Sequence, residues 1–409
     1  MNILYINHYA GSKYHGMEFR PYYLGIEWRK KGNLVVIVAG SESHVRKKSP
    51  KMKRHLQVEV IDDLYYYWIR TPHYNGNGFA RAINIFSFVI QLIFYKKLLI
   101  NQIKPDVVIA SSTYPLDIIP AYLISRKSNA KLIFEVHDLW PLSPIELGGM
   151  SPKNPFIILM QFAENFAYKN ADLVVSILPK TIDHMVEHGL DSKKFYYIPN
   201  GINSKEWDNH NTPLRNHLNS IIMELKKKQK FLIGYAGSHG IANSLGIIIK
   251  AADFLRNENI SFVLVGDGPE KTKLVELTKI KKLDNVIFFD SISRDEIPDF
   301  LGNMDVLFIG LKNEPLFRFG VNPNKLIDYM MAGKPIIYAI NSGNNMVNES
   351  KCGISIKPEN PEELSKAILD LRNLSEKERN ELGENGKSFI LANNNYDVLG
   401  QKFLDLFMT

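Results

Sequence analysis

Short runs of β-branched and other apolar residues alternate with helix-like segments along almost the whole chain. Most runs are apolar at consecutive rather than alternate positions, which indicates strands that are buried on both faces of a parallel sheet covered by helices. The predicted strands are 2–7, 34–39, 106–110, 131–136 and 172–177, with 65–70 as a further candidate, followed by 231–236, 260–265, 284–289, 305–310 and 334–339. This alternation predicts an α/β fold with doubly wound sheets.

The series of strands and helices is interrupted once, by a polar and turn-rich segment at residues 199–230 that we interpret as a linker. A chain of 409 residues is long for one core and suits two domains of about 200 residues each. We therefore expect Rossmann-like domains at 1–200 and 201–393, facing each other across a cleft at the carboxyl ends of their strands. The last segment, 394–409, contains a helix at roughly 396–408 that could pack on the first domain.

The composition is that of an ordinary globular protein, with 45% hydrophobic and 23% charged residues. Cys352 is the only cysteine, which excludes a disulfide framework and suits the reducing cytoplasm. The first residues, MNILYIN, lack the basic start of a secretory signal. The longest apolar run, 83–95, is shorter than the roughly 20 residues that cross a bilayer. We expect a cytoplasmic protein without a membrane span.

Positive charge is concentrated in the first half of the chain. Residues 1–204 carry 24 Lys and Arg against 16 Asp and Glu, whereas residues 205–409 carry 26 against 27. The densest group consists of six cations, namely Arg46, Lys47, Lys48, Lys51, Lys53 and Arg54. This group is either an ordinary solvated loop or a site for phosphates and anionic lipid. Nucleic acid is a poorer match, because no nucleic-acid module or aromatic-basic stripe accompanies the cations.

The apolar run at 83–95 has polar residues at helical spacing, with Asn84, Ser87 and Gln91 forming one narrow stripe. Two interpretations stay open. The segment is a buried helix of the first domain, or its wide apolar face lies in a membrane interface, with Lys96 and Lys97 at its end.

The segment 318–335, RFGVNPNKLIDYMMAGKP, carries the most chemistry. It predicts a helix that starts near Asn324 and ends at Gly333, and a helix N-terminus suits phosphate because it presents free N–H groups and partial positive charge. Lys325 in the first turn is unfavourable for the helix dipole unless an anion binds there. Asp328 could accept hydrogen bonds from ribose hydroxyls. The alternative is an ordinary αβ unit in which Gly333 only caps the helix.

This segment resembles the donor-binding motif of the family 4 retaining glycosyltransferases, where two spaced acidic residues are followed by Gly-Lys-Pro. It is most similar to a bacterial O-antigen and capsule subgroup that includes N-acetyl-fucosaminyl transferases, with Pro-Asn/Ser-Lys-Leu and then Glu/Asp-Tyr-Met. Further similarities follow in family order, at FEVHDLWP (134–141), IPNGI (198–202), YAGSHG (235–240) and LVGDGP (264–269). The resemblance covers essentially the whole chain and implies the GT-B fold.

The resemblance implies that the first domain binds the acceptor and the second binds the nucleotide-sugar donor. His137 matches the histidine that faces the transferred sugar, with Asp138 beside it, although a lone histidine is more often structural. The positions matching the donor site, including the glycine loop from Gly11, are Gly16, Arg20, Gly237, Ser238, Gly266, Ile292, Arg318, Asn324, Lys325 and Asp328.

The chain departs from the family pattern at two places. Ser238 and Asn243 stand where the family has an Arg and a Lys that neutralise the departing nucleoside diphosphate. Gly320 stands where the first acidic residue is expected, and Glu314 fits that role only if the loop is longer. Because such electrostatic contacts are worth several kcal/mol, we expect a replacement cation, Lys325, with Arg318 as a second candidate.

These observations predict transfer of an N-acetylated or deoxy hexose from a UDP-sugar to a lipid-diphosphate-linked saccharide of a surface polysaccharide. We expect it at the inner face of the cell membrane, with retained configuration and without cofactor or metal, through positioning and diphosphate stabilisation. The alternatives are a GT-B sugar-nucleotide epimerase and a non-catalytic two-lobed sugar-binding protein. A Rossmann oxidoreductase is disfavoured, because Gly-x-Gly-x-x-Gly is missing after the first strand.

Overall fold

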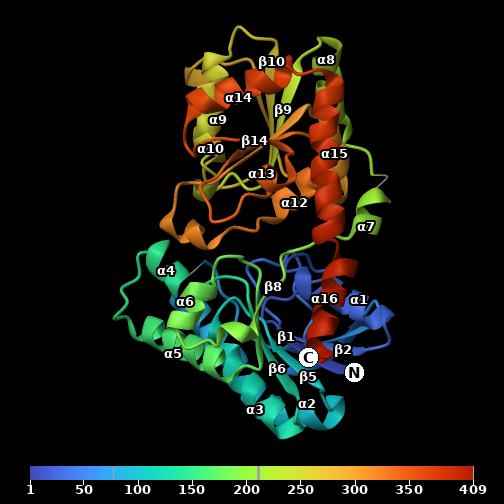
Figure 1. Ribbon diagram of the computed structural model, residues 1–409, viewed down its shortest axis with the longest axis vertical. Coiled ribbons are helices and arrows are strands. Elements are labelled where there is room, and N and C mark those ends of the chain that lie inside the picture. Colours follow the sequence, from blue (N-terminus) through green and yellow to red (C-terminus); the bar gives the residue numbers. More distant parts are fainter. Residues whose placement is uncertain (77, 210–211, 409) are drawn as a thin grey trace. The chain divides into compact units, whose positions relative to one another are not determined.

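The computed structural model describes residues 1–76, 78–209 and 212–408. The chain forms two compact units, each with its own sheet and helices (Figure 1). The first unit comprises Met1–Gly201 and the C-terminal segment from Tyr396, and the second comprises Ile202–Asn395. The sequence-based boundary at 200/201 differs from this division by one residue.

The described residues of the first unit contain a sheet with the strand order β3-β4-β2-β1-β5-β6-β7-β8. All neighbouring strands are parallel except β3 and β4, which form an antiparallel pair at the edge. The strands are β1 (Asn2–Ile6), β2 (Leu34–Gly40), β3 (Leu56–Ile61), β4 (Leu64–Ile69), β5 (Val107–Ala110), β6 (Lys131–Val136), β7 (Leu173–Ser176) and β8 (Phe195–Tyr197). The sequence analysis missed β3 and β8.

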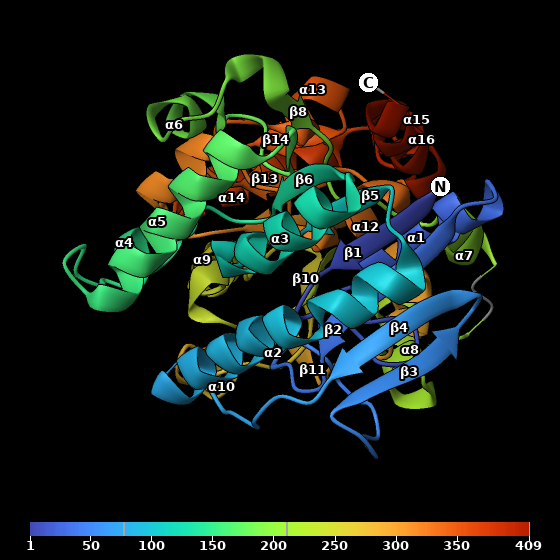
Figure 2. The ribbon, with the colours of Figure 1, turned by 90° about the horizontal axis from the view of Figure 1, so that it is seen from below.

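Helices cover both faces of this sheet. They are α1 (Arg20–Lys30), α2 (Phe79–Ile103), η1 (Pro115–Asp117), α3 (Ile118–Ser128), α4 (Leu142–Glu146), α5 (Pro155–Asn170), α6 (Ile182–Glu187), η2 (Ser192–Lys194) and α16 (Tyr396–Met408). Figure 2 shows α2, α3 and α5 following one another across one face. On the other face, Ile3 and Tyr5 of β1 share a core with Trp28 of α1 and Phe403 of α16.

The C-terminal helix α16 packs on the first unit, at the residues where the sequence predicts a helix. The indole N–H of Trp28 donates to the Gly400 carbonyl oxygen at 3.1 Å. The Trp28 ring lies 5.5 Å and 5.4 Å from the rings of Phe403 and Phe407 between centroids. These aromatic contacts bury the apolar face of α16, so a segment from the end of the chain completes the first core.

The described part of the second unit holds a parallel sheet with the strand order β11-β10-β9-β12-β13-β14. The strands are β9 (Phe231–Ala236), β10 (Ile260–Val265), β11 (Val286–Phe289), β12 (Val306–Gly310), β13 (Ile336–Ala339) and β14 (Gly353–Ser355). The helices are α7 (Ser204–Asp208), α8 (Asn216–Lys227), η3 (Ile241–Asn243), α9 (Gly246–Phe254), α10 (Lys271–Ile280), η4 (Arg294–Glu296), α11 (Ile297–Gly302), η5 (Pro315–Phe319), α12 (Asn324–Met331), α13 (Met346–Ser350), α14 (Pro361–Asn373) and α15 (Glu376–Asn393).

Two of the sequence-based interpretations need correction. The segment 199–230 is not simply a linker, because α8 lies within it and packs Leu218 and Ile222 into the core of the second unit. The apolar run at 83–95 is the middle of α2, whose 25 residues are long and apolar enough to cross a membrane by length and composition alone. Core helices of soluble proteins pass the same test, and α2 buries seven of its residues in the first unit.

Candidate functional site

In the second unit, two glycine-bearing turns meet at the carboxyl ends of β9 and β10. The Gly237 N–H donates to the Val265 carbonyl oxygen at 3.0 Å. A Cβ on Gly266 would lie 1.8 Å from the Gly237 carbonyl oxygen, and the φ of Gly266 is +148°. Only glycine fits at position 266, because both the contact and the φ exclude a side chain. The carboxyl ends of parallel strands are where doubly wound sheets bind ligands.

Lys325 lies beside these turns, in the first turn of α12. Its ammonium donates to the Tyr235 hydroxyl at 3.1 Å and to the Asn243 side-chain oxygen. It also lies 5.0 Å from the centre of the Tyr235 ring. Burial lowers the pKa of Lys325 to about 8. Among the described residues no carboxylate forms an ion pair with it, so its charge is compensated only by dipoles and a ring face.

The N-terminus of α12 adds positive potential at this point. Its N-cap, Pro323, makes no side-chain capping bond, and no acidic residue lies in the first turn. Asn324, the first residue of the helix, is exposed. The helix dipole and Lys325 therefore both favour a bound anion, and no carboxylate among residues 1–76, 78–209 and 212–408 forms an ion pair with Lys325.

Asp328, predicted to hold the ribose, already has a partner. Both of its carboxylate oxygens accept hydrogen bonds from Arg294 of η4, at 2.5 Å and 2.7 Å. Asp328 is buried whereas the Arg294 side chain is half exposed. A ribose hydroxyl would therefore have to share the Asp328 carboxylate with Arg294 or displace the Arg294 guanidinium from this bidentate ion pair. The sequence analysis did not identify Arg294, since no motif marks it.

His239 is another residue of this site that the sequence analysis missed. It is fully buried next to the glycine turns, and a Cβ on Gly268 would lie 2.6 Å from its backbone carbonyl oxygen. Neither ring nitrogen has a hydrogen-bond partner among the described residues. Burial lowers the pKa of His239 to about 4, so the ring is neutral at pH 7. An unsatisfied ring N–H is costly when buried, which makes His239 a candidate for contact with a ligand.

The other predicted donor residues of this unit have different surroundings. Ser238 is exposed, and its backbone oxygen accepts from Tyr235 at 2.7 Å and from the Asn243 side chain at 3.0 Å. The Ile292 side chain is part of the hydrophobic core. Arg318 is exposed, lies 4.3 Å from the Phe319 ring centre and donates to the Pro315 carbonyl oxygen at 2.8 Å.

The loop between β12 and α12 explains one departure from the family pattern. Gly320, at the position of the first acidic residue, has φ +103°. An acidic side chain rarely adopts this conformation, so the loop takes a path that an acidic residue at position 320 would strain. Glu314 lies at the start of η5, as its N-cap.

In the first unit, His137 lies at the carboxyl end of β6. Its Nε2 is 2.8 Å from the Ser111 hydroxyl oxygen and 3.3 Å from a carboxylate oxygen of Glu135. The Ser111 hydroxyl donates its own hydrogen to Glu135 at 2.6 Å. Both neighbours of Nε2 are therefore acceptors, so Nε2 must carry a hydrogen. In the neutral ring, Nδ1 then keeps its lone pair and can accept a proton.

Glu135 provides a buried negative charge next to His137. Burial alone would raise its pKa, but the Arg20 guanidinium together with hydrogen bonds from His137 and Ser111 holds the pKa well below its usual range. The Tyr5 hydroxyl also donates to its carboxylate. Glu135 therefore stays ionised and can stabilise a positive charge on the imidazole of His137.

Arg20 is placed differently from the prediction that it contacts a donor diphosphate. Its side chain is 1% exposed, and its Nε donates to Glu135 at 2.9 Å. Its two terminal nitrogens donate to the carbonyl oxygens of Pro199 and Ile198. All three guanidinium nitrogens therefore donate hydrogen bonds within the first unit. Through them Arg20 links α1 to β6 and to the backbone at Ile198 and Pro199. Gly16 closes a tight turn, with its N–H on the Ser12 carbonyl oxygen at 2.8 Å.

Asp138 is engaged in its own loop. One oxygen accepts from the Leu139 N–H at 2.9 Å and from the Ser143 hydroxyl at 2.5 Å. Burial raises its pKa above the usual range. These contacts hold the turn into α4.

The basic segment exposes five cations rather than six. Arg46 is 8% exposed, donates to the Gly40 carbonyl oxygen and lies 5.0 Å from the Trp68 ring centre. Burial lowers the pKa of Arg46 to about 10. Arg46 is therefore part of the interior, which corrects its assignment to a surface patch. The exposed cations are Lys47, Lys48, Lys51, Lys53 and Arg54.

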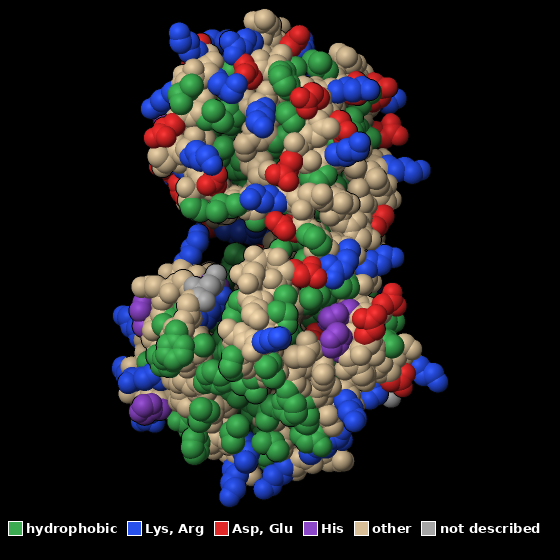
Figure 3. All heavy atoms as spheres, turned by 90° about the vertical axis from the view of Figure 1, so that its left-hand side faces the viewer, with side chains coloured by type: hydrophobic (Ala, Val, Ile, Leu, Met, Phe, Trp, Pro, Cys, Tyr) green, Lys and Arg blue, Asp and Glu red, His purple; other side chains and the backbone are tan. Residues whose placement is uncertain are grey.

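The polar stripe of α2 faces the protein together with apolar residues such as Ile85 and Phe88, whereas other apolar residues of the helix face outwards. The Asn84 side chain donates to the Pro72 carbonyl oxygen at 2.7 Å, and the Gln91 side chain donates to the Arg70 carbonyl oxygen at 2.7 Å. Phe79 and Phe94 are 80% and 78% exposed. Figure 3 shows hydrophobic side chains gathered on this unit. The exposed apolar residues of α2 and α5 are Phe79, Ile83, Ile90, Phe94, Ile158 and Phe162.

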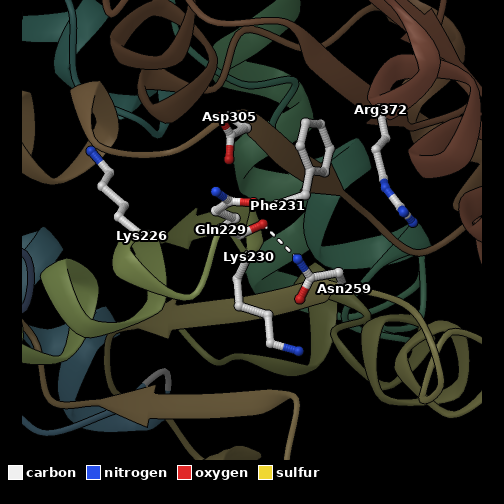
Figure 4. A pocket seen from close by; sticks show the side chains of 7 residues that line it. All are labelled: Lys226, Gln229, Lys230, Phe231, Asn259, Asp305 and Arg372. Carbon is white, nitrogen blue, oxygen red and sulfur yellow. Dashed lines mark hydrogen bonds between the residues drawn. The ribbon is translucent and has the colours of Figure 1, made fainter.

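A pocket in the second unit lies at the amino ends of the strands (Figure 4). It is lined by Lys226, Gln229, Lys230, Phe231, Asn259, Asp305 and Arg372. Lys226 donates to Asn303 at 2.6 Å and Arg372 to Glu258 at 2.7 Å. This end of a doubly wound sheet is opposite the one that binds ligands, so the pocket is not the candidate donor site.

The sequence matches two families in succession. Residues 14–206 match "Glycosyltransferase Family 4", and residues 220–389 match "Glycosyl transferases group 1". The "Probable glycosyltransferase WbjE" of Pseudomonas aeruginosa is 26% identical over 330 residues, which are 77% of this chain and 78% of that protein. A protein of Escherichia coli strain K12 named as a colanic acid biosynthesis glycosyl transferase, WcaI, is 25% identical over 259 residues, covering 62% of this chain and 61% of WcaI.

The structure is similar over its whole length to solved structures. Anabaena Alr3699/HepE, crystallised with UDP and glucose, superposes with a TM-score of 0.66 at 14% identity, covering 99% of each chain. At this identity the similarity concerns the fold.

Proposed function

The chain is a family 4 glycosyltransferase with the GT-B fold, and we propose that it transfers a sugar from UDP onto a lipid-diphosphate-linked saccharide of a surface polysaccharide. The donor is inferred from the structural neighbour that holds UDP and glucose. The polysaccharide is inferred from the relative named for colanic acid biosynthesis. Following the O-antigen and capsule subgroup that the sequence resembles, we propose an N-acetylated or deoxy hexose as the transferred sugar.

The contact between Lys325 and Asn243 carries the proposal for the donor diphosphate. Asn243 stands where the family has a lysine, and the Lys325 ammonium donates to its side-chain oxygen. The missing cation is thus replaced in space by a lysine from the first turn of α12. A diphosphate bound at this helix end would gain the charge of Lys325 and the uncapped N–H groups together.

We propose that His137 acts on the acceptor side of the reaction. Its Nδ1 is free to receive the proton of an acceptor hydroxyl, and Glu135 would stabilise the imidazolium that results. Transfer with retained configuration would then rest on positioning and on stabilisation of the leaving diphosphate. The proposal requires neither a cofactor nor a metal ion for the reaction itself.

We further propose that the first unit docks peripherally on the cytoplasmic face of the cell membrane. Phe79, Phe94 and their exposed neighbours on α2 and α5 supply the apolar contact. The five exposed cations supply attraction to anionic lipid. The backbone of Arg70 connects the apolar face of α2 with the exposed cations. Its carbonyl oxygen accepts from the Gln91 side chain of α2, and its N–H donates to the carbonyl oxygen of His55, which follows the cations.

A donor and acceptor screen tests this function. The full chain is incubated with UDP-, GDP- and dTDP-sugars, with and without a polyprenyl-diphosphate saccharide in vesicles. We expect UDP release that depends on the acceptor, with label recovered in the lipid fraction. Conversion of the donor without acceptor would indicate an epimerase instead. Nucleotide-sugar binding with no turnover under any combination would indicate a binding protein.

A further inference from the structure

The first unit gathers one carboxylate and two imidazoles at the contact between α5 and α6. Glu164 belongs to α5, His184 to α6, and His188 follows α6 directly. Each offers one ligand atom, and these atoms lie within 4.8 Å of one another. No metal ligands were predicted from the sequence, which has no Asp-x-Asp type cluster at a strand end. We propose that Glu164, His184 and His188 form a Zn²⁺ site that fastens α6 to α5.

The distances suit a tetrahedral ion. Zn²⁺ binds nitrogen and oxygen ligands at about 2.0–2.1 Å, which separates neighbouring ligand atoms of a tetrahedron by about 3.3–3.4 Å. The His184 Nε2 and the Glu164 carboxylate oxygen are 3.3 Å apart. The ligand atom of His188 lies within 4.8 Å of the other two, so a small side-chain movement completes the set. Two imidazoles with one carboxylate leave a fourth position for water.

Hydrogen bonds around the cluster orient its side chains and leave a lone pair on the ligand atom of His188. His188 Nδ1 lies 2.8 Å from the His184 carbonyl oxygen, which can only accept, so Nδ1 carries the hydrogen and Nε2 keeps its lone pair. The Tyr168 hydroxyl donates to one Glu164 oxygen at 2.9 Å, and the Gln161 amide donates to the other at 2.7 Å. Outer hydrogen bonds of this kind orient the ligands in protein metal sites.

The surroundings of the buried Glu164 side chain also suit a bound cation. Its side chain is 2% exposed, and within the described part of the chain no lysine or arginine pairs with it. The ionisable partner found there is His184, whose Nε2 must be without a proton when it binds a metal. Zn²⁺ would compensate the buried carboxylate with the ligand types that this ion prefers, whereas Mg²⁺ and Ca²⁺ prefer oxygen ligands only.

The cluster is separate from the residues assigned to sugar transfer. Its role is to hold α6, a helix of six residues that follows β7 and buries His184 and Met185. At the start of α6, Thr181 donates to the Ser176 hydroxyl at 3.1 Å. A metal at the other end of α6 would fix both ends of the segment. Figure 2 shows α6 next to the end of α5.

The test compares full-length protein, stripped with a chelator and dialysed, in four forms: wild type, His188→Gln, Glu164→Gln and the control His55→Gln, whose imidazole is exposed elsewhere. Zn²⁺ and Mg²⁺ are titrated by calorimetry and by thermal unfolding. We expect one Zn²⁺ per wild-type and control chain with a raised Tm, no response to Mg²⁺, and affinity lowered at least about tenfold in each ligand variant. Co²⁺ should give the absorption of a four-coordinate ion in wild type and control alone.

Equal Zn²⁺ affinity in wild type and His188→Gln would overturn the proposal, as would the absence of saturable binding. Circular dichroism of the metal-free variants shows whether each one folds. Should one ligand variant fail to fold, the other decides by the Co²⁺ spectrum, since each removes a ligand atom by itself. Because the readouts are metal binding and stability, failure here leaves the proposal of sugar transfer untouched.

Discussion

Replacing Lys325 by methionine tests the donor site most directly. Methionine keeps much of the aliphatic length and removes the ammonium that lies between Tyr235 and Asn243. We expect a large loss of affinity for UDP and almost none for uridine, because only UDP places negative charge at the N-terminus of α12. Lys325→Arg is the matched control, since it keeps a charge at this position.

The size of the loss follows from the contacts of the ammonium. A hydrogen bond to an ionised group contributes about 1.5–3 kcal/mol net, which corresponds to about 10- to 150-fold in Kd. Coulomb's law at an effective dielectric of about 20 and a separation of about 4 Å gives about 4 kcal/mol, which is an upper limit. We therefore expect the Kd for UDP to rise about 10- to 150-fold in Lys325→Met, measured by calorimetry at pH 7.

The pH dependence adds a second signature with a definite sign. Burial lowers the pKa of Lys325 to about 8, so the free site loses its charge as the pH rises through 8. The phosphates of UDP are already fully ionised there, since the second phosphate pKa is about 6. Affinity of the wild type should therefore fall between pH 8 and pH 9 by up to about tenfold, whereas Lys325→Arg should show no such fall.

Stability should change in the opposite direction. The pKa of Lys325 is lower in the folded chain than in the unfolded chain, so the unfolded chain binds more protons between pH 8 and about 10.4, and stability rises with pH in that window. At pH 7 the ligand-free protein carries a largely buried ammonium at Lys325, which has hydrogen bonds but no ion pair with any carboxylate that the structure describes. Lys325→Met should unfold at the same or a higher denaturant concentration than the wild type. Equal weakening of UDP and uridine binding, or a large loss of stability, would refute the assignment of Lys325 to the diphosphate.

Three further predictions concern the first unit. Glu135→Gln leaves the Arg20 guanidinium buried without its carboxylate and should cost about 3–5 kcal/mol in urea unfolding; a change below about 1 kcal/mol would contradict the ion pair as a structural element. His137→Gln should slow transfer by about 10²–10⁴-fold at unchanged UDP affinity, and a parallel loss of both would favour a structural role. Changing Ile90 and Phe94 together to Asp should abolish flotation with anionic liposomes, while His55→Gln should float like the wild type; salt-insensitive binding, or none at all, would contradict peripheral docking.

The sequence predicts the central strands well because their physics is local. β6, β9 and β10 have the predicted bounds. Strands that are buried on both faces consist of continuous apolar runs, so their ends can be recognised in the sequence. The edge strand β3 differs because it is antiparallel and half solvated, with Val58 and Val60 exposed. Its turn at Asp62 and Asp63 has two positive φ angles, a signal that the sequence analysis did not use.

The helix α8 was missed for a related reason. Its surroundings are polar and turn-rich, and its buried side chains are Leu218 and Ile222, four residues apart. Two apolar positions on one face are too weak a pattern to identify a helix without knowledge of the core that they fill. The orientation of α2 could not be predicted either, because the partners of Asn84 and Gln91 are backbone carbonyls at Pro72 and Arg70.

At the candidate sites the sequence identifies positions but not partners. Lys325 and Asp328 were predicted as site residues because a short motif holds them on one helix. Arg294, which occupies Asp328, lies 34 residues away in the chain, and Arg20 lies 115 residues from Glu135. A free arginine in the sequence is equally suited to a ligand or to a buried carboxylate, and only the fold decides between them.

The position of the cation on a helix rather than in a loop has consequences for how the donor binds. A lysine in the first turn of α12 is repelled by the helix dipole, and its burial lowers its pKa. Both costs are present in the free protein, and the attraction between the ammonium and a bound diphosphate would offset them. If Lys325 binds the diphosphate, we expect the stabilisation of the leaving group to depend on pH, because the pKa of Lys325 is lowered to about 8 whereas an arginine would stay charged. Weaker donor binding at pH 9 than at pH 7 would then follow from the use of Lys325 in place of loop cations.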